Sequence, residues 1–394
     1  MNLDPRTRRL SRLAAVLALL AAAGCSSGSS GPATLARSIA IADLDGGGRL
    51  DVLTALSSSN PASSFLSARI QLPAAPGTFD APVRSPTGLV PVAMAVGDLD
   101  GDGLPDVVVA DAGAGPAGYG VDVQYRVPAT PGAFTAPVVL PLGALIPVDV
   151  ALADLDGDGR RDVVVAASGA SSVQVFFQQP SGAFGPATAF AAGGEPTAVA
   201  AGDLTGSGRQ DLVVAAANGR VAVLLHGATP GSFLPPVTYA AGTSPSAVRL
   251  ADMDGDGRLD VVLADLQGVL LVLLQSPSGG GVLLPAATYA TLGYGSCSIA
   301  IGDVDGDGRP DVVVANAGPL GDPGSVSVFL QGAVPGRLGI PMLYAGYWGP
   351  LWVALGDLDG DGRLDMAVAD GGPSIRFQSP ALPGFFLPPV WLYE

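Results

Sequence analysis

The sequence contains no lysine, one histidine, two glutamates and two cysteines. All 19 basic residues are arginine, which excludes Schiff-base chemistry and lysine nucleophiles. The other 33 acidic residues are aspartates, and the formal net charge is −16. Because nucleic-acid binding depends on basic side chains that neutralise phosphates, this balance argues against nucleic acid as a partner.

Long apolar runs are also absent after residue 25, so no later segment predicts a membrane-spanning helix. The first 25 residues instead read as an export signal with a positive region, a short apolar region and a cysteine. Ala22-Ala23-Gly24-Cys25 resembles a bacterial lipobox, in which the cysteine becomes the lipidated first residue. The alternative is an ordinary signal peptide that happens to have a cysteine nearby.

The N-terminal organisation follows from this interpretation. Residues 1–24 are predicted to be a lipoprotein signal peptide, and residues 25–36, rich in Ser and Gly, a tether that starts at lipidated Cys25. Membrane contact is then expected through a lipid anchor only. The residue after the cysteine is Ser26 and not the aspartate that favours inner-membrane retention, so the protein is expected to be exported to the outer membrane.

What the sequence does contain is a repeated acidic loop, D-x-D-x-D-G-x-x-D. Two degraded copies begin at Asp43, where Gly47 replaces the third carboxylate, and at Asp203, where Thr205 and Ser207 replace two. The seven loops start 55, 56, 49, 49, 51 and 54 residues apart, so one structural unit is repeated seven times. The carboxylates of the five complete copies are Asp98, Asp100, Asp102 and Asp106; Asp154, Asp156, Asp158 and Asp162; Asp252, Asp254, Asp256 and Asp260; Asp303, Asp305, Asp307 and Asp311; and Asp357, Asp359, Asp361 and Asp365.

Four carboxylates within nine residues repel one another unless a cation lies among them. Oxygen-only ligands at this density favour Ca²⁺, whereas Mg²⁺ demands stricter geometry. We expect ligands from the side chains at positions 1, 3, 5 and 9 and from the backbone carbonyl at position 7, in about five sites. An EF-hand is excluded because position 12 is apolar and the flanking segments are rich in β-formers. Metal-free Asp-Gly turns are the alternative, and for the loops at Asp43 and Asp203 it stays open.

Each repeat predicts four short strands. In the fourth repeat, the runs 197–201, 211–215, 220–225 and 233–239 are separated by turn residues. A four-stranded meander of this size cannot bury its apolar faces alone, so the units must pack face to face in a ring. The prediction is an all-β, seven-bladed β-propeller over residues 37–394. Because the repeats are complete at both ends, we expect closure without an exchanged strand, through apolar contact alone.

The Asp loops, together with runs such as Phe79-Asp-Ala-Pro82 and Phe134-Thr-Ala-Pro137, resemble the FG-GAP or VCBS repeats of integrin alpha propellers and of many bacterial exported proteins. The resemblance covers about residues 36–394. It implies the propeller fold and calcium binding. It implies little about function, because that family includes adhesins, lectins and domains attached to enzymes.

Catalysis is the less expected class. No G-x-S-x-G, H-E-x-x-H or P-loop pattern occurs. His226 ends the third run of its repeat, where other repeats carry glutamine, so it is expected to be a surface polar residue. Cys297 lies at the start of a predicted strand and is expected to be a small buried thiol rather than a nucleophile. No catalytic residue is assigned.

A ligand site is predicted on the ring face opposite the metal loops, where aromatic side chains accompany acidic or amide ones. The alternative is that the polar members cap turns and the aromatic members fill gaps between blades. The candidate residues are Asp111, Tyr119, Asp265, Tyr294, Asn316, Tyr347, Trp348 and Asp370.

The function predicted from the sequence is therefore a calcium-stabilised, envelope-anchored propeller that serves as a non-catalytic binding or adhesion module for a glycan or protein. Two alternatives stay open, an exported enzyme acting on polysaccharide and a purely structural envelope protein.

Overall fold

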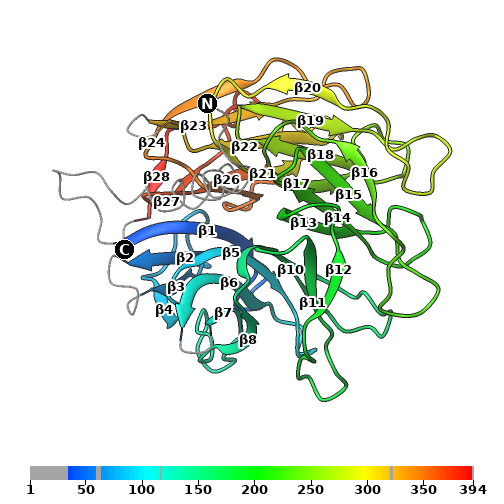
Figure 1. Cartoon of the computed structure of the whole chain (residues 1–394). Helices are drawn as coiled ribbons and strands as arrows, with labels where there is room; N and C mark the ends of the chain where they lie inside the picture. The colour runs from blue at the N-terminus through cyan, green and yellow to red at the C-terminus, as the bar shows by residue number, and fades with distance from the viewer. Residues whose placement is uncertain (1–33, 59–63, 116–117, 320–322, 393–394) are drawn as a thin grey trace, which may run out of the picture.

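The computed structural model describes residues 34–58, 64–115, 118–319 and 323–392. The predicted signal peptide, Cys25 and most of the predicted tether lie outside these ranges. Seven four-stranded antiparallel sheets surround a central axis in chain order (Figure 1). The predicted seven-bladed propeller is therefore confirmed. No helix within the described ranges has the length and apolarity needed to cross a membrane.

Every blade is built from four consecutive strands, and neighbouring blades follow one another around the ring. The strands of blades one to four are β1 (Thr34–Ala42), β2 (Asp51–Ser58), β3 (Phe65–Arg69), β4 (Val83–Pro86); β5 (Pro91–Gly97), β6 (Asp106–Gly115), β7 (Gly118–Gln124), β8 (Val138–Gly143); β9 (Ile146–Ala153), β10 (Asp162–Ser168), β11 (Ser172–Phe176), β12 (Thr188–Ala191); and β13 (Pro196–Gly202), β14 (Asp211–Ala216), β15 (Arg220–Leu224), β16 (Val237–Ala240). Those of blades five to seven are β17 (Pro245–Ala251), β18 (Asp260–Asp265), β19 (Val269–Leu273), β20 (Ala287–Ala290); β21 (Ser296–Gly302), β22 (Asp311–Asn316), β23 (Gly324–Phe329), β24 (Met342–Tyr347); and β25 (Trp352–Gly356), β26 (Asp365–Asp370), β27 (Gly372–Arg376), β28 (Val390–Trp391).

The second strand of each blade explains why the units associate. Successive side chains of a strand point to opposite faces, so an uninterrupted apolar run makes both faces of the blade apolar. In β18, Val261 and Leu263 pack into the core shared with blade four, whereas Val262 and Ala264 pack into the core shared with blade six. Seven apolar clusters of this kind separate the seven pairs of neighbouring blades.

Within the described residues, the ring closes between blades one and seven without strand exchange, as predicted, because each of these blades contains four of its own strands. The expectation that apolar contact alone holds this junction is wrong. Nε2 of Gln71, at the end of the third run of blade one, donates to the backbone oxygen of Leu358 in blade seven. Gln178 and Gln378 bridge to Leu99 and Val304 of their preceding blades in the same way.

These glutamines also correct the expectation of a surface polar position. Gln71, Gln178, Gln275, Gln331 and Gln378 are all buried. The side chain at this position reaches toward backbone groups that the loops leave unpaired, and a buried carbonyl needs such a donor. The position is therefore part of the packing within and between blades.

Three side chains from blades three, five and seven meet near the ring axis. Trp352 of blade seven packs against both the cluster between blades seven and one and the cluster between blades two and three, so its side chain extends toward the centre of the ring. The Arg249 guanidinium lies 5.7 Å from the centre of the Trp352 ring. Burial raises the pKa of Asp149, and the charge of Arg249 opposes this effect. The other six blades carry alanine at the position of Arg249, namely Ala40, Ala95, Ala151, Ala200, Ala300 and Ala354.

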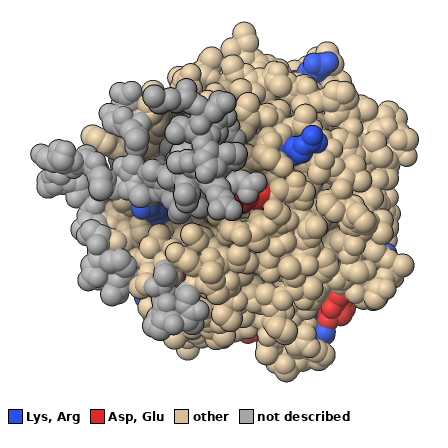
Figure 2. Space-filling model, in the orientation of Figure 1, with Lys and Arg blue, Asp and Glu red and all other residues tan. Residues whose placement is uncertain are grey.

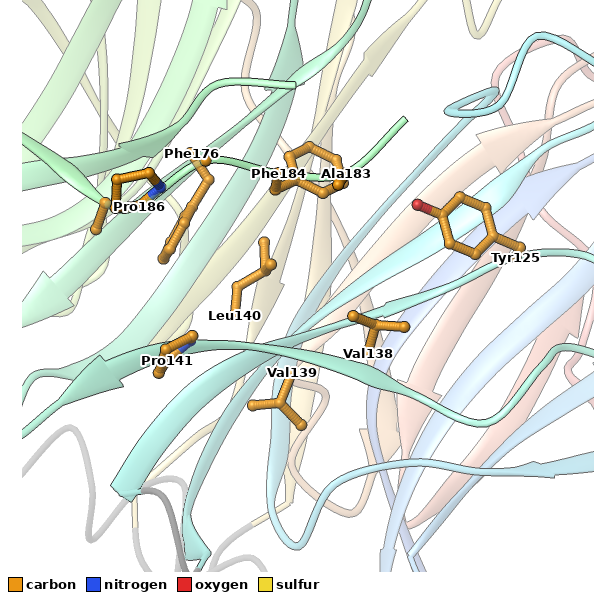
Figure 3. A pocket seen from close by; sticks show the side chains of 11 residues that line it. Tyr125, Val138, Val139, Leu140, Pro141, Phe176, Ala183, Phe184 and Pro186 are labelled. Carbon is orange, nitrogen blue, oxygen red and sulfur yellow. The ribbon is translucent and has the colours of Figure 1, made fainter. Parts of the chain in front are cut away.

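One face of the ring carries few charged side chains (Figure 2). At the outer rim, an apolar hollow of about 510 Å³ lies between blades two and three (Figure 3). Its walls include Val138, Leu140, Phe176 and Phe184, and Tyr125 supplies the single polar side chain. A hollow with so few polar groups does not provide the converging donors and acceptors of an active site.

The first testable prediction concerns the junction between blades one and seven. Its apolar cluster contains seven buried residues, against ten to fourteen at the other six junctions. We expect amides of β1 and β25 to exchange with solvent before those of the other inner strands, measured by hydrogen exchange with mass spectrometry. Gln71→Ala is expected to accelerate exchange further at this junction, whereas Gln178→Ala, the matched change at another junction, leaves it unchanged. Uniform exchange around the ring would contradict the prediction.

Candidate metal centres

Each metal loop joins the first strand of a blade to the second and is folded by its own aspartates. In blade six, Asp303 accepts hydrogen bonds from the backbone N–H groups of Gly306, Asp307 and Gly308 at 2.8, 3.0 and 2.8 Å. Gly306 and Gly308 have φ values of 77° and 85°, the left-handed region that glycine adopts without steric cost. The first carboxylate and the two glycines therefore turn the loop back on itself.

The ninth aspartate fixes the loop to the blade. In blade six, Asp311 Oδ2 accepts from Val304 N at 2.8 Å and Oδ1 accepts from Gln331 N at 2.6 Å. The same two bonds occur in all seven blades. One carboxylate at the start of the second strand thus holds two segments. One is the loop after the first strand, and the other is the chain at the end of the third strand.

The structure brings the first, third and ninth carboxylates of a loop together. Among the residues that the structure describes, six groups of at least three ligand residues have carboxylate oxygens within 4.8 Å of one another. The five that follow the same pattern in blades one, two, three, five and six are Asp43, Asp45 and Asp51; Asp98, Asp100 and Asp106; Asp154, Asp156 and Asp162; Asp252, Asp254 and Asp260; and Asp303, Asp305 and Asp311. In blade seven, Asp357 and Asp365 make the same loop hydrogen bonds.

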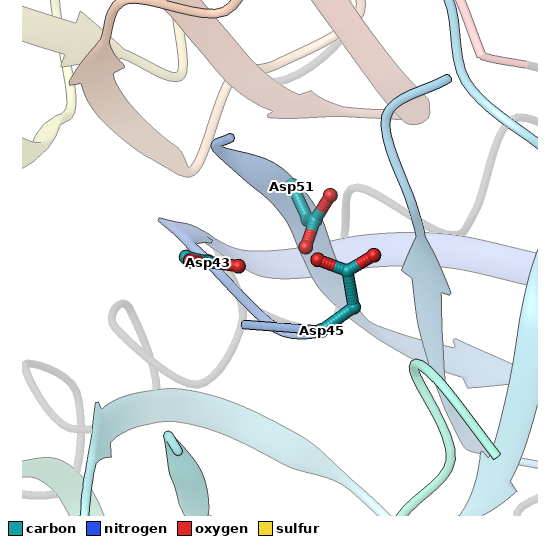
Figure 4. Close-up of side chains that lie close together, drawn as sticks. All are labelled: Asp43, Asp45 and Asp51. Atoms are coloured by element: carbon teal, nitrogen blue, oxygen red, sulfur yellow. The ribbon is translucent and has the colours of Figure 1, made fainter. Parts of the chain in front are cut away.

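The blade-one loop contains one of these clusters although the sequence suggested a degraded site. Asp43, Asp45 and Asp51 converge from the end of β1, the loop and the start of β2 (Figure 4). Gly47 replaces only the fifth-position aspartate, which is not a member of the cluster in any of the five groups named above. The structure therefore supports six carboxylate clusters rather than about five.

The pKa values of the clustered aspartates show that each cluster lacks a compensating positive charge. In six blades the pKa of the ninth aspartate is raised to about 6, mainly by burial and in smaller part by the neighbouring carboxylates of the loop. Backbone hydrogen bonds lower it only in part. The residues concerned are Asp51, Asp106, Asp162, Asp260, Asp311 and Asp365. A buried carboxylate beside two others is stabilised most directly by a cation.

The donor set fits Ca²⁺. Carboxylate oxygens bound to one calcium ion at 2.3–2.6 Å lie at most about 5 Å apart, which matches the spread of these clusters. All side-chain ligands are oxygen, so the soft metals that select sulfur or imidazole are disfavoured. Asp43, Asp45 and Asp51, or their equivalents, would hold the ion, which would supply the positive charge that the loop lacks.

The fifth-position aspartate faces another partner. Asp307 accepts from Arg309 N at 2.9 Å, and its second oxygen pairs with the Arg309 guanidinium. Asp158, Asp256 and Asp361 pair with Arg160, Arg258 and Arg363 in the same way. Participation of Asp102, Asp158, Asp256, Asp307 and Asp361 in an ion-bound site stays a prediction.

Blade four differs from the others in two coupled positions. Its loop has Thr205 and Ser207 in place of two aspartates, and its third strand is followed by His226 where five blades have glutamine. His226 Nδ1 lies 2.6 Å from Asp211 Oδ1, and Nε2 lies 3.3 Å from Ser207 Oγ. Imidazole and hydroxyl groups therefore occupy the region where the other loops gather carboxylates. The expectation that His226 is a simple surface residue is wrong, and sequence reasoning missed this contact because Ser207 and His226 are 19 residues apart.

A serine–histidine–aspartate relay activates the nucleophile of many hydrolases, but stabilisation of the oxyanion is also required. Here the backbone N–H groups of Ser207 and Gly208 donate to Asp203, at 3.0 and 2.6 Å. The N–H of Arg209 donates to Ser207 Oγ itself. The amides nearest the serine are thus engaged within the loop, and the geometry fits a closed, hydrogen-bonded turn.

The polar residues of the predicted ligand face are engaged inside the protein. Asp111 accepts from Leu89 N and Val90 N, and Asp265 accepts from Thr243 N and Ser244 N. Asn316 bonds Ser296 and Ser327, and Asp370 accepts from Trp348 N at 2.7 Å. All four are buried, so they hold the connections between blades and cap turns. Burial raises the pKa of Asp370 to about 7.

The aromatic residues of that face divide into two groups. Tyr347 is buried, and its hydroxyl accepts from Arg376 Nε at 2.6 Å, so it is not a surface platform. Tyr119 is partly buried at the start of β7. Tyr294 and Trp348 are 62% and 77% exposed. Cys297 donates to Gly295 O, and burial raises the pKa of its thiol to about 12, which disfavours the nucleophilic thiolate.

Comparison with known proteins identifies the family to which the chain belongs. Residues 154–214, 203–263, 252–314 and 303–368 each match the FG-GAP-like repeat, and together they cover more than half of the chain. The chain belongs to the FG-GAP-like repeat family. Human integrin alpha-IIb is 41% identical over 97 residues, which are 21% of this chain and 9% of the integrin. The FG-GAP chain therefore matches only a small part of that much longer relative.

Solved structures with the same fold show low sequence identity. The BBS1N domain from its complex with ARL6DN has a TM-score of 0.57 at 14% identity, covering 86% of this chain and 90% of that one. A putative 6-phosphogluconolactonase of Bacteroides fragilis gives 0.59 at 15%, covering 92% and 95%. The Pseudomonas aeruginosa periplasmic gluconolactonase PpgL gives 0.55 at 18%, covering 78% and 85%. At such identities these likenesses establish the propeller fold alone.

The second prediction tests the metal. Chelation is expected to lower the melting temperature sharply, because it leaves clustered charge beside the inner strands, and excess Mg²⁺ is expected to restore it poorly. Asp305→Ala is expected to cost about 1–3 kcal/mol in calcium. Asp307→Ala, in the same loop, is the matched control for the fifth position. A loss of unfolding free energy equal to that of Asp305→Ala would show that Asp307 also binds the ion. Unchanged melting in chelator, with no calcium found by elemental analysis, would refute the metal sites.

The third prediction concerns pH. In six blades the ninth aspartate has a pKa raised to about 6 in the folded chain, above its ordinary value of 3.8, so protonation of these carboxylates stabilises the folded form of the metal-free protein. Stability of the chelated protein should therefore rise as the pH is lowered from about 8 to about 5, and fall as the pH rises through about 6. With calcium the trend should reverse, because protons compete with the ion. The measurement is the melting temperature as a function of pH, with and without calcium. The same direction of change with pH in both conditions would contradict the prediction.

The fourth prediction separates blade four from the rest. Because His226 and Ser207 fill its loop, we expect six bound calcium ions per chain by calorimetric titration. The combination of Thr205→Asp, Ser207→Asp and His226→Gln restores the pattern of the other blades and is expected to add a seventh ion. Seven ions in the unaltered chain, or no gain in the triple variant, would overturn this view of blade four.

Proposed function

We propose that this FG-GAP protein is a calcium-stabilised propeller, anchored to the cell envelope through Cys25, that acts as a non-catalytic binding or adhesion module for a glycan or protein. The observation that carries the proposal is the set of six carboxylate clusters built into a closed ring. Calcium at these sites would make a rigid scaffold whose surface loops are available for recognition. The likeness to part of integrin alpha-IIb supports a role in recognition.

The anchor is proposed from the sequence ahead of the ring. Arg6, Arg8, Arg9 and Arg12 precede an apolar segment that ends in Ala22-Ala23-Gly24-Cys25. A single lipid chain gives reversible membrane binding, and stable anchoring takes a second acyl chain or another membrane contact. Outer-membrane placement is proposed for a cell with two membranes.

A second candidate function, an exported hydrolase acting on polysaccharide, is favoured by one observation, the contact of His226 with both Asp211 and Ser207. The engagement of the neighbouring amides argues against it. Labelling of Ser207 by a fluorophosphonate probe, lost in Ser207→Ala, would support this second function, and absence of labelling would remove its main support.

The fifth prediction tests the binding function. The lipid-modified chain, prepared with calcium and again after chelation, is applied to panels of glycans and of envelope and matrix proteins. Saturable binding without product release, lost on chelation, is the expected result. Product release from a glycan would favour the enzyme, and absence of both binding and turnover would favour a structural role.

The anchor is tested in the same preparation. Partitioning into detergent and a lipid-modified Cys25 by mass spectrometry are expected, and Cys25→Ser should yield a soluble or uncleaved form. An unmodified N-terminus at another residue would refute the anchor.

A further inference from the structure

Three large apolar side chains stand out from the end of the ring near blade six. Leu292, Tyr294 and Trp348 are 58%, 62% and 77% exposed. Leu292 and Tyr294 lie in the connection from blade five to blade six, and Trp348 lies in the connection from blade six to blade seven. We call these three residues the blade-six patch.

The backbone at Leu292 points to a role other than folding. Leu292 has a φ of 60° and is the one non-glycine residue with a positive φ among the residues described. The two preceding connections have Gly193 and Gly242 at the corresponding position, with φ values of 70° and 91°. A leucine in this left-handed region is strained relative to a relaxed backbone, and its side chain is exposed to solvent. Strain of this kind clusters at functional positions.

The patch is held firmly in place. Trp348 N donates to the buried Asp370, and Gly318 N donates to Tyr294 O at 2.9 Å. A methyl group added at Gly349 would lie 3.3 Å from Ala317 O, so the connection that carries Trp348 lies against the segment that binds Tyr294. The apolar side chains therefore project from a fixed base, which lowers the entropic cost of inserting them into a partner.

Among the residues described, the end of the ring that carries the patch has few exposed charged side chains, one of which is Arg220 at the start of β15. The first strand of each blade runs from this end toward the metal loops, so acidic loops and their arginines lie at the opposite end. Asp111, Asp265 and Asp370, which belong to the patch end, are buried, and Glu195 accepts hydrogen bonds from Ser168 and Gly169. Figure 2 shows a ring face with few acidic or basic side chains visible.

The chain enters the ring at this same end. β1 begins at Thr34 and runs toward the metal loop that starts at Asp43, so Thr34 lies on the side of the patch. Cys25 precedes Thr34 by nine residues, which span at most about 30 Å when fully extended. A lipid on Cys25 would keep this end of the ring within that distance of the bilayer.

We propose that the blade-six patch inserts into the interfacial layer of a phospholipid bilayer and orients the ring with its metal loops away from the membrane. This inference rests on the proposed anchoring through Cys25. Tryptophan and tyrosine favour the boundary between headgroups and hydrocarbon, and an exposed leucine adds apolar area. Because no basic cluster accompanies the patch among the residues that the structure describes, insertion should not depend on anionic lipids or low salt.

The experiment uses the lipid-modified full-length product in phosphatidylcholine vesicles that contain brominated acyl chains, which quench nearby tryptophan emission. The chain has three tryptophans, and we expect Trp348→Phe to remove most of the quenching. Leu292→Gly is expected to lower the ratio of molecules with the patch inserted in the bilayer to molecules with the patch in water by roughly tenfold. The melting temperature of this variant is expected to be unchanged or higher. Ile340→Asp is the matched control, because Ile340 is exposed on the connection between the third and fourth strands, at the metal-loop end.

The outcomes separate the inference from the anchor on which it rests. Quenching that is lost in Trp348→Phe and Leu292→Gly, but kept in Ile340→Asp and in high salt, supports the proposal. A lipid-modified Cys25 with no quenching of Trp348 overturns the orientation and leaves the anchor intact. An unmodified Cys25 overturns both. Loss of glycan or protein binding, or of self-association, in Trp348→Ala, together with no quenching of Trp348 in the unaltered chain, would assign the patch to those partners and overturn the bilayer proposal.

Discussion

Every blade depends on a buried carboxylate that bonds two backbone amides from different parts of the chain. The ninth aspartate of each loop accepts one hydrogen bond from the loop and one from the end of the third strand. It thereby fixes the first three strands of the blade to one another at the end that carries the aspartate loop. Because the carboxylate is buried, its charge requires compensation, and the neighbouring aspartates make that requirement stronger. The carboxylate that holds the blade together is therefore also a member of the carboxylate clusters that could bind a metal ion.

The propeller itself could be predicted from the sequence because its signals are local and repeated. The spacing of the Asp loops, the apolar runs and the turn residues all recur within about fifty residues, and apolar runs such as Val312–Val314 leave no solvent-facing side of the second strand. The sequence pattern did not predict the three-carboxylate cluster of blade one, because it gave the fifth position the same weight as the first, third and ninth. In the folded loops of blades one, two, three, five and six, only the first, third and ninth carboxylates form the cluster.

What could not be predicted depends on residues far apart in the chain. Gln71 looks like a polar residue at a strand end, yet its partner Leu358 lies 287 residues later. Tyr347 is buried and accepts a hydrogen bond from Arg376, 29 residues later, and Trp352 of blade seven pairs with Arg249 of blade five. Polar side chains at turns are usually exposed, so the burial of Asp265 and Asp370 follows from the connections they hold rather than from their own sequence context.

The entry of the chain through the innermost strand has a mechanical consequence. A pull on the residues before Thr34 acts along the axis of β1, which pairs with β2 over nearly its full length. Hydrogen bonds between antiparallel strands lie perpendicular to the strands, so such a pull loads them together in shear instead of opening them one after another. A ring attached in this way would resist drag or tension better than one attached through an outer strand such as β28, whose two residues would peel away first.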